Sequence, residues 1–165
     1  DQRNRARIEV FVPQRSNLKI TSNGEIRIDG VSGDVKVDGE DEAINVRDVE
    51  GKLKVSNTDG RIRVIGFRGE IDAATGDGMI SLEGDFNKLT ARGTEGAITL
   101  TLPEDASADL EANRPELVGD GIALQRISSD ESTTRYRIGR GGAVFHIDTA
   151  GEITVRSSRS VSETQ

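Results

Sequence analysis

Residues 57–69 read NTDGRIRVIGFRG, and this stretch repeats a pattern that the chain has already used. GEDEAINVRDVEG at 39–51 lies 18 residues earlier, and TSNGEIRIDGVSG at 21–33 lies 36 residues earlier, almost in register. Each copy holds a short alternating apolar segment and ends on Gly. Repeats of this length at a fixed period are typical of solenoid proteins. This repeat therefore decides the fold class.

Apolar residues recur at the same interval along most of the chain. One row is Ile26, Ile44, Ile62, Ile80 and Ile98, and a second row, nine positions before the later isoleucines, is Val35, Leu53, Ile71 and Leu89. The residue two positions after each member is also apolar. Alternation at spacing two, with β-branched residues bounded by Gly and by Asn or Asp, indicates strands rather than helices.

Each unit is too short for a strand–helix–strand crossover, so the economical fold is an all-β, single-stranded parallel β-helix with about 18 residues per coil. Equivalent residues would stack about 4.8 Å apart, and inward ladders would form a continuous core with few aromatic residues. A left-handed helix of hexapeptides would want aliphatic residues every six positions, but Asp41 and Arg47 follow Val35. A right-handed coil is therefore favoured, in line with the general hand of parallel crossovers.

Glycines mark both corners of the predicted coil. Gly33, Gly51 and Gly69 close successive units. Other glycines follow Asn or Asp, as in the pairs Asn23–Gly24, Asp59–Gly60 and Asp77–Gly78. At these pairs we expect tight corners in which Gly permits a positive φ.

The repeat frame breaks after residue 102 and later recovers. LPEDASADLEA at 102–112 can supply another coil, and the period resumes in AVFHIDTAGEITVRS at 143–157. Residues 114–142 lose the period, and we expect them to pack beside or over the end of the solenoid and to shield its open edge. ARIEVFV at 6–12 would shield the other end.

These boundaries predict a β-helix domain at residues 5–157. Flexible tails are expected at 1–4 and 158–165, where the composition is polar.

The overall composition excludes several classes of function. The net charge is −7, with 22 basic and 29 acidic residues, so the chain lacks the basic face that nucleic-acid binding needs. No apolar run approaches a transmembrane span, and no signal peptide is present. The sequence begins without Met, so we expect that an export signal could have been trimmed from it. There is no Cys, which excludes disulfides and thiolate metal sites.

The chain resembles a bacterial family of predicted adhesins whose function is unknown. The resemblance rests on VFVPQRSNLKITSNGEIRIDGVSGDVKV at 10–37, on LPEDASADLEA at 102–112 and on GGAVFHIDTAGEITVRS at 141–157, and it covers roughly residues 6–157. It implies an exported β-solenoid of the cell envelope, periplasmic or at the cell surface. It brings no catalytic motif.

One row of acidic residues is a candidate metal site. Asp41, Asp59, Asp77 and Glu95 recur at the 18-residue interval. Stacked carboxylates repel one another, so they could recruit Ca²⁺, which prefers oxygen ligands. The alternative is that these are solvated corner residues. The Gly-Gly-x-Gly-x-Asp signature of calcium-binding β-rolls is absent.

A second row alternates in sign and consists of Asp34, Lys52, Glu70 and Lys88. In a stack of coils each of these residues would face an opposite charge, which would help to set the register. Arg27 and Arg63, with Asn45 between them, are too sparse for a polyanion track.

Enzyme functions find little support in these residues. His146 is the only histidine, and its place between Phe145 and Ile147 predicts that it points outward. A pair of carboxylates for glycoside cleavage would need a defined cleft, which the sequence does not indicate.

We therefore expect a non-enzymatic envelope module, an adhesin or binding protein without a cofactor, whose partner is a surface glycan or a protein. The alternative is a structural scaffold that self-associates by stacking its coils end to end. A third reading, a polysaccharide-active enzyme, would need acidic and basic side chains converging in one groove.

Overall fold

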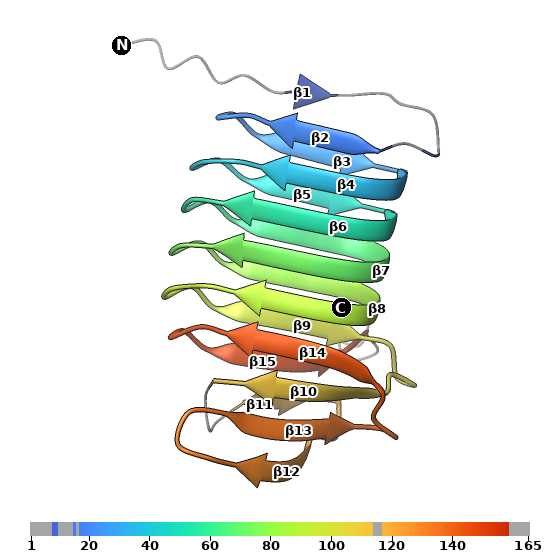
Figure 1. The fold of residues 1–165 in the computed structure, drawn as a ribbon, viewed down its shortest axis with the longest axis vertical. Coiled ribbons are helices and arrows are strands. Elements are labelled where there is room, and N and C mark those ends of the chain that lie inside the picture. Colours follow the sequence, from blue (N-terminus) through green and yellow to red (C-terminus); the bar gives the residue numbers. More distant parts are fainter. Residues whose placement is uncertain (1–7, 10–14, 16, 114–116, 159–165) are drawn as a thin grey trace.

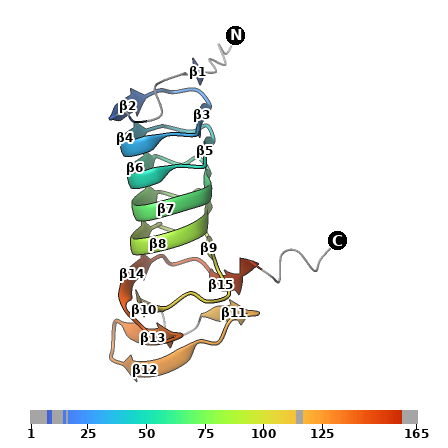
Figure 2. The ribbon, with the colours of Figure 1, turned by 90° about the vertical axis from the view of Figure 1, so that its right-hand side faces the viewer.

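The structure is a computed structural model that describes residues 8–9, 15, 17–113 and 117–158. It is an all-β parallel solenoid (Figure 1), and the predicted fold class is confirmed. Each coil places one strand on a front face, toward the viewer in Figure 1, and the next strand on a back face. Figure 2 shows these two faces side-on, as two thin layers.

The strands divide between the faces by sequence order. On the front face lie β2 (Leu18–Thr21), β4 (Ser32–Asp38) and β6 (Glu50–Asn57), and on the back face lie β1 (Ile8–Glu9), β3 (Ile26–Asp29), β5 (Ile44–Arg47) and β9 (Ile98–Leu102). Two longer strands, β7 (Ile62–Thr75) and β8 (Ile80–Arg92), begin on the back face and continue around a corner onto the front face of the next coil.

The register follows the 18-residue period. Ile26, Ile44, Ile62, Ile80 and Ile98 are successive partners in the back sheet, giving about five coils. All of them are buried, as are the inward residues of the front-face strands from β4 to β8, whereas Leu18 and Ile20 of β2 are half-buried. Burying each such side chain stabilises the fold by about 1.5–3 kcal/mol. Three aromatic rings also pack together inside the solenoid. Phe67 and Phe86 are stacked with centroids 5.7 Å apart, and Phe86 and Phe145 make a T-shaped contact with centroids 6.2 Å apart.

The coil is right-handed, as predicted. In Figure 1 the front strands run to the left, and the chain returns to the right behind them while it descends from the N-terminal end.

Positive φ values recur at one corner of the coil, but this is the opposite corner from the one at which the sequence predicted them. Gly24, Gly60 and Gly78 are absent from the described residues that have positive φ, so that prediction is wrong. The left-handed conformations occur instead at Gly33, Gly51 and Gly69, with φ of 136°, 128° and 130°. Gly60 and Gly78 are required for a different reason, because a Cβ on Gly78 would overlap the carbonyl oxygen of Gly60 in the coil before it.

The last coils are out of sequence order. β10 (Ala108–Ala112) forms where a further coil was predicted, but it does not pair with β8. The returning strand β14 (Ala143–Asp148) lies between them and pairs parallel with both. On the back face β15 (Ile153–Ser157) lies in the same way between β9 and β11 (Val118–Asp120).

An antiparallel hairpin closes the C-terminal end of the stack (Figures 1 and 2). It consists of β12 (Gln125–Ser129) and β13 (Thr134–Ile138), and β13 pairs with β10. The expectation that residues 114–142 cover this end is confirmed for the part of the segment that the structure describes.

At the N-terminal end β1 pairs with β3. The rest of the predicted cap at 6–12 lies outside the described residues, as do most residues of the two predicted tails.

Candidate functional site

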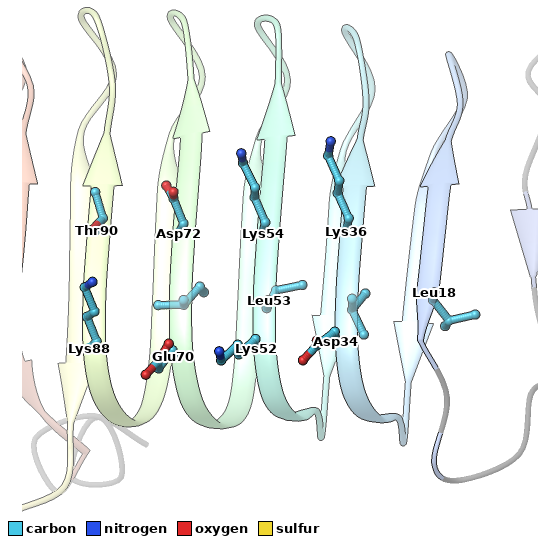
Figure 3. Close-up of a pocket in the computed structure, with 12 residues that line it drawn as sticks. Leu18, Asp34, Lys36, Lys52, Leu53, Lys54, Glu70, Asp72, Lys88 and Thr90 are labelled. Carbon is cyan, nitrogen blue, oxygen red and sulfur yellow. The ribbon is translucent and has the colours of Figure 1, made fainter.

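Grooves lie on both outer faces of the described solenoid, and one on each face gathers charged side chains in rows. The front groove, of about 520 Å³, runs across the coils between two rows of outward side chains (Figure 3). The first row, the alternating row, is Asp34, Lys52, Glu70 and Lys88, and the second, the lysine row, is Lys36, Lys54, Asp72 and Thr90. Strand alternation places both rows outside, because the residues between them point into the core.

The register confirms the predicted stacking of the alternating row. Asp34 is the partner of Lys52, Lys52 of Glu70, and Glu70 of Lys88. The four side chains are exposed, and no ion pair within 4.0 Å forms among them. Such exposed neighbours contribute about 0.2–1 kcal/mol each.

The lysine row holds like charges in direct register, which the sequence analysis missed. Lys19 is the partner of Lys36, and Lys36 is the partner of Lys54, before Asp72 reverses the sign. Like charges directly opposite one another in a sheet are destabilising. The spacing of 17 and 18 residues between these lysines was the signal that could have revealed the row.

The back groove, of about 230 Å³, is lined by three arginines, by Asp29 and Asn45, and by apolar residues. Arg27, Asn45 and Arg63 are register partners, and Arg47 lies beside them on β5. All three arginines are exposed, and the guanidinium of Arg27 lies 3.9 Å from the Glu25 carboxylate. Arg47 was missed because it belongs to a different row, whose other members are Asp29 and Ile65. The groove can take a carboxylate or a phosphate, to which guanidinium groups bind with paired hydrogen bonds.

Side chains of β10, β13 and β14 form a small polar network on the front face around Glu111. His146 points outward, as predicted, and its Nδ1 lies 3.9 Å from Oε2 of Glu111. Arg135 Nε lies 3.8 Å from the same oxygen. These half-exposed pairs join β14, β10 and β13.

Asp109 has the best-defined polar contacts in this region. Arg137 Nε donates to its Oδ1 at 3.0 Å, and the backbone N–H of Gly142 donates to its Oδ2 at 3.2 Å. The hydrogen bond from Arg137, followed by that from Gly142, lowers the pKa of the Asp109 carboxyl. The contact ties β10 to β13 and to the corner that leads into β14.

The candidate calcium row lies at the corners of the coils, and its four members, Asp41, Asp59, Asp77 and Glu95, are exposed. Asp59 Oδ1 accepts a hydrogen bond at 3.4 Å from the backbone N–H of Asp77 in the next coil. Within the described residues, no three His, Cys, Asp or Glu side chains come together in a way that could hold a metal ion. In this arrangement Asp59 acts as a corner acceptor.

Acidic and basic side chains line the front groove together, which is the arrangement that a polysaccharide-active enzyme would need. Glu70 and Asp72 lie on the same face of β7, two residues apart. Glycoside cleavage by two carboxylates uses one acid that its surroundings keep protonated. Both side chains are exposed on an open sheet, so the groove offers no enclosure for such an acid.

The sequence model of Toastrack DUF4097, a family of unknown function, matches residues 14–116. No curated protein matches the chain. No solved structure matches it either. In the part of the chain that the structure describes, no helix combines the length and the apolarity needed to cross a membrane.

Proposed function

The chain belongs to the Toastrack DUF4097 family, and we propose that it is a non-enzymatic interaction module of the bacterial cell envelope, which binds an anionic partner through its back face. The observation that carries the proposal is the back groove, which Arg27, Arg47 and Arg63 line together with a single carboxylate, that of Asp29. Their planar donors suit the carboxylates or phosphates of an envelope polymer. Export to the envelope rests on the resemblance of the sequence to predicted adhesins.

The rigidity of the solenoid supports a binding role. Each arginine of the back groove alternates along its strand with buried residues, such as Ile28 and Val46, that fix the backbone. A site held in place before binding loses little conformational entropy when the partner docks.

The alternative, a scaffold that grows by stacking coils end to end, fits the structure less well. Growth of that kind needs a parallel strand edge at both ends of the solenoid. At the C-terminal end of the front face β13 runs antiparallel to β10, and β12 runs antiparallel to β13, so the all-parallel stack stops there. A module that binds through its sides is therefore favoured.

Co-sedimentation of the purified chain with isolated peptidoglycan sacculi tests the proposal. The wild-type chain is expected to pellet with the sacculi, and added salt should release it because salt screens charge pairs. Arg47→Gln should weaken binding about five- to tenfold. Arg140→Gln is the matched control, since it removes the same charge from an exposed corner far along the chain.

Two outcomes would contradict the proposal. One is a wild-type chain that stays in the supernatant at low salt, and the other is equal binding by the two arginine variants. Release of soluble sugar from the sacculi would instead support an enzyme.

A further inference from the structure

The order of charges on the front face is such that the same row, read from its other end, has the opposite sign at every position. Along the alternating row the signs run minus, plus, minus, plus from Asp34 to Lys88. Read from the other end, the row gives plus, minus, plus, minus. A second copy that is turned over therefore presents the opposite charge at every position of this row.

We propose that two copies of this chain associate face to face through their front faces, with their solenoid axes antiparallel. The twofold axis lies parallel to the strands, between the coil of β6 and the front-face half of β7. This symmetry places Asp34 opposite the partner's Lys88 and Lys52 opposite the partner's Glu70. In the lysine row it places Lys54 opposite the partner's Asp72.

The rows that flank the groove fit the same axis. In one of them the partners run Ser32, Glu50, Arg68 and Asp85, and in the other Asp38, Ser56, Ala74 and Arg92, with Asp148 beyond. The twofold axis sets Glu50 against the partner's Arg68 and Asp38 against the partner's Arg92. Across all four rows, from the coil of β4 to that of β8, no like charges meet. Isologous interfaces of this kind are the commonest in soluble homo-oligomers.

Register within one chain explains only part of this complementarity. Lys52 and Glu70 are neighbours in the stack, so their opposite signs already help the coils to align. Strict alternation between neighbours already gives Asp34 and Lys88 opposite signs. Asp38 and Arg92 are different, because the uncharged Ser56 and Ala74 lie between them in their row. They are three coils apart, about 14 Å along the axis, where exposed charges are largely screened, so their complementarity does not follow from pairing between neighbouring coils.

The opposite orientation of the two copies is disfavoured by charge at the centre of the face, although Asp34 would then face the partner's Lys36. With parallel axes, Lys52 would face the partner's Lys54, and Glu70 would face the partner's Asp72. Like charges held directly opposite one another across an interface are unfavourable. The pattern thus selects one docking geometry out of the two that pair the same faces.

The front face is free to make these contacts. The residues of the alternating row are exposed and form no ion pair within 4.0 Å in their own chain. Figure 3 shows the strands of this face lying side by side with little twist, which lets two sheets meet along several coils. Four strands cover about 500 Å² at ordinary spacing, less than the usual ~800 Å² per partner. We therefore expect a weak, salt-sensitive dimer.

This inference goes beyond the proposed function and leaves its site untouched. The back grooves of the two copies would point outward on opposite sides of the dimer. A polymeric ligand could then engage both grooves, which raises the overall affinity without any new contact.

A pair of charge variants tests the proposal. Lys52→Glu with Lys54→Glu makes the centre of the face acidic, and Glu70→Lys with Asp72→Lys makes it basic. Sedimentation velocity at low salt should show wild-type dimers and at least tenfold weaker self-association of either variant alone. An equimolar mixture of the two variants should restore the dimer, because every central pair across the twofold axis then has opposite signs.

Mixing separates contacts between chains from effects inside one chain. Each double substitution also stacks like charges within its own coils, and circular dichroism and thermal melting of each variant report any damage to the fold. A second copy cannot repair such damage, so recovery on mixing requires the proposed interface. Arg63→Glu on the back face is the control, and it should dimerise like the wild type.

Three results would overturn the inference: a monomeric wild type at every concentration reached, dimers of a single variant as tight as those of the wild type, or a mixture that stays monomeric.

Discussion

Gly69 and Gly142 have nearly the same backbone conformation, with φ of +130° and +128°, but different surroundings. A Cβ on Gly69 would overlap the carbonyl oxygen of Gly51 in the neighbouring coil, whereas a Cβ on Gly142 would have nothing within 4 Å. Both alanine variants incur the conformational cost of positive φ, about 1–3 kcal/mol. Gly69→Ala should lose at least about 2 kcal/mol more in the free energy of unfolding, as over-packing does. Urea unfolding measures the difference, and equal losses would show that stacking contact is not what requires Gly69.

A buried hydroxyl at the opposite corner supports the coils. Thr75 is buried, and its Oγ1 donates to the carbonyl oxygen of Gly60 at 3.1 Å. Thr75→Val keeps the shape but leaves that carbonyl without this donor, so we expect a loss of about 1–3 kcal/mol in the free energy of unfolding. Thr58→Val, at an exposed corner position, should change it by about 0.5 kcal/mol or less. Similar thermal melting of both variants would contradict this account of the corner.

At the residue scale the sequence predicted which side chains lie inside and which lie outside, because alternation and the 18-residue period leave one consistent solution. It did not predict which glycines have positive φ. Gly serves both left-handed corners and close approaches between coils, and both needs recur once per coil. Only the backbone distinguishes Gly51, with its φ of +128°, from Gly78.

β14 is the element that holds the C-terminal coils to the rest of the stack. In the described structure β10 pairs with β14 and β13 and has no direct pairing with β8. A chain that ends at Gly142 should therefore lose hydrogen-exchange protection over β10 and β13, while β3 to β7 remain protected. Protection of β10 in the truncated chain would mean that it can pair with β8 directly and that the inserted coil is dispensable.

The contact between Asp109 and Arg137 predicts a pH-dependent stability of the C-terminal hairpin. The pKa of Asp109 is lowered in the folded state, chiefly by the hydrogen bond from Arg137. Its contribution is therefore present above the ordinary carboxyl pKa and is lost as the pH falls through the lowered value. Asp109→Asn should destabilise the chain at neutral pH and match the wild type in strong acid, as followed by thermal melting.

Asp105→Asn, at an exposed position before β10, is the control for this measurement and should leave the melting temperature unchanged at both pH values. An equal effect of Asp109→Asn at neutral and acid pH would show that the charge of Asp109 does not matter.

At the element scale the strands could be located from the sequence, but the order of the last coils could not. β14 and β10 carry the same pattern of alternate apolar residues, so either can dock on the parallel edge of β8. Phe145 is the feature that distinguishes β14. Its ring meets the edge of Phe86 inside the solenoid, a contact that Leu110 or an alanine cannot reproduce.

At the scale of the whole molecule, the surface grooves combine rows that sequence analysis treated separately. The alternating row could be predicted, since its members share one period. Arg47 lines the same groove as Arg27 and Arg63 because two neighbouring rows, whose residues lie two positions apart in each coil, run side by side. Such a site becomes visible only when the coil places adjacent rows side by side.

The central claim is that this chain is a solenoid whose C-terminal end is closed by the β12–β13 hairpin and that acts through its sides. Light scattering on a size-exclusion column, across a wide concentration range and at high salt, tests it most directly. High salt suppresses charge contacts between faces, whereas backbone pairing between open strand edges would persist. We predict the mass of a single chain at every concentration. A mass that climbs with concentration under these conditions would show that the ends of the solenoid are open and would contradict the account.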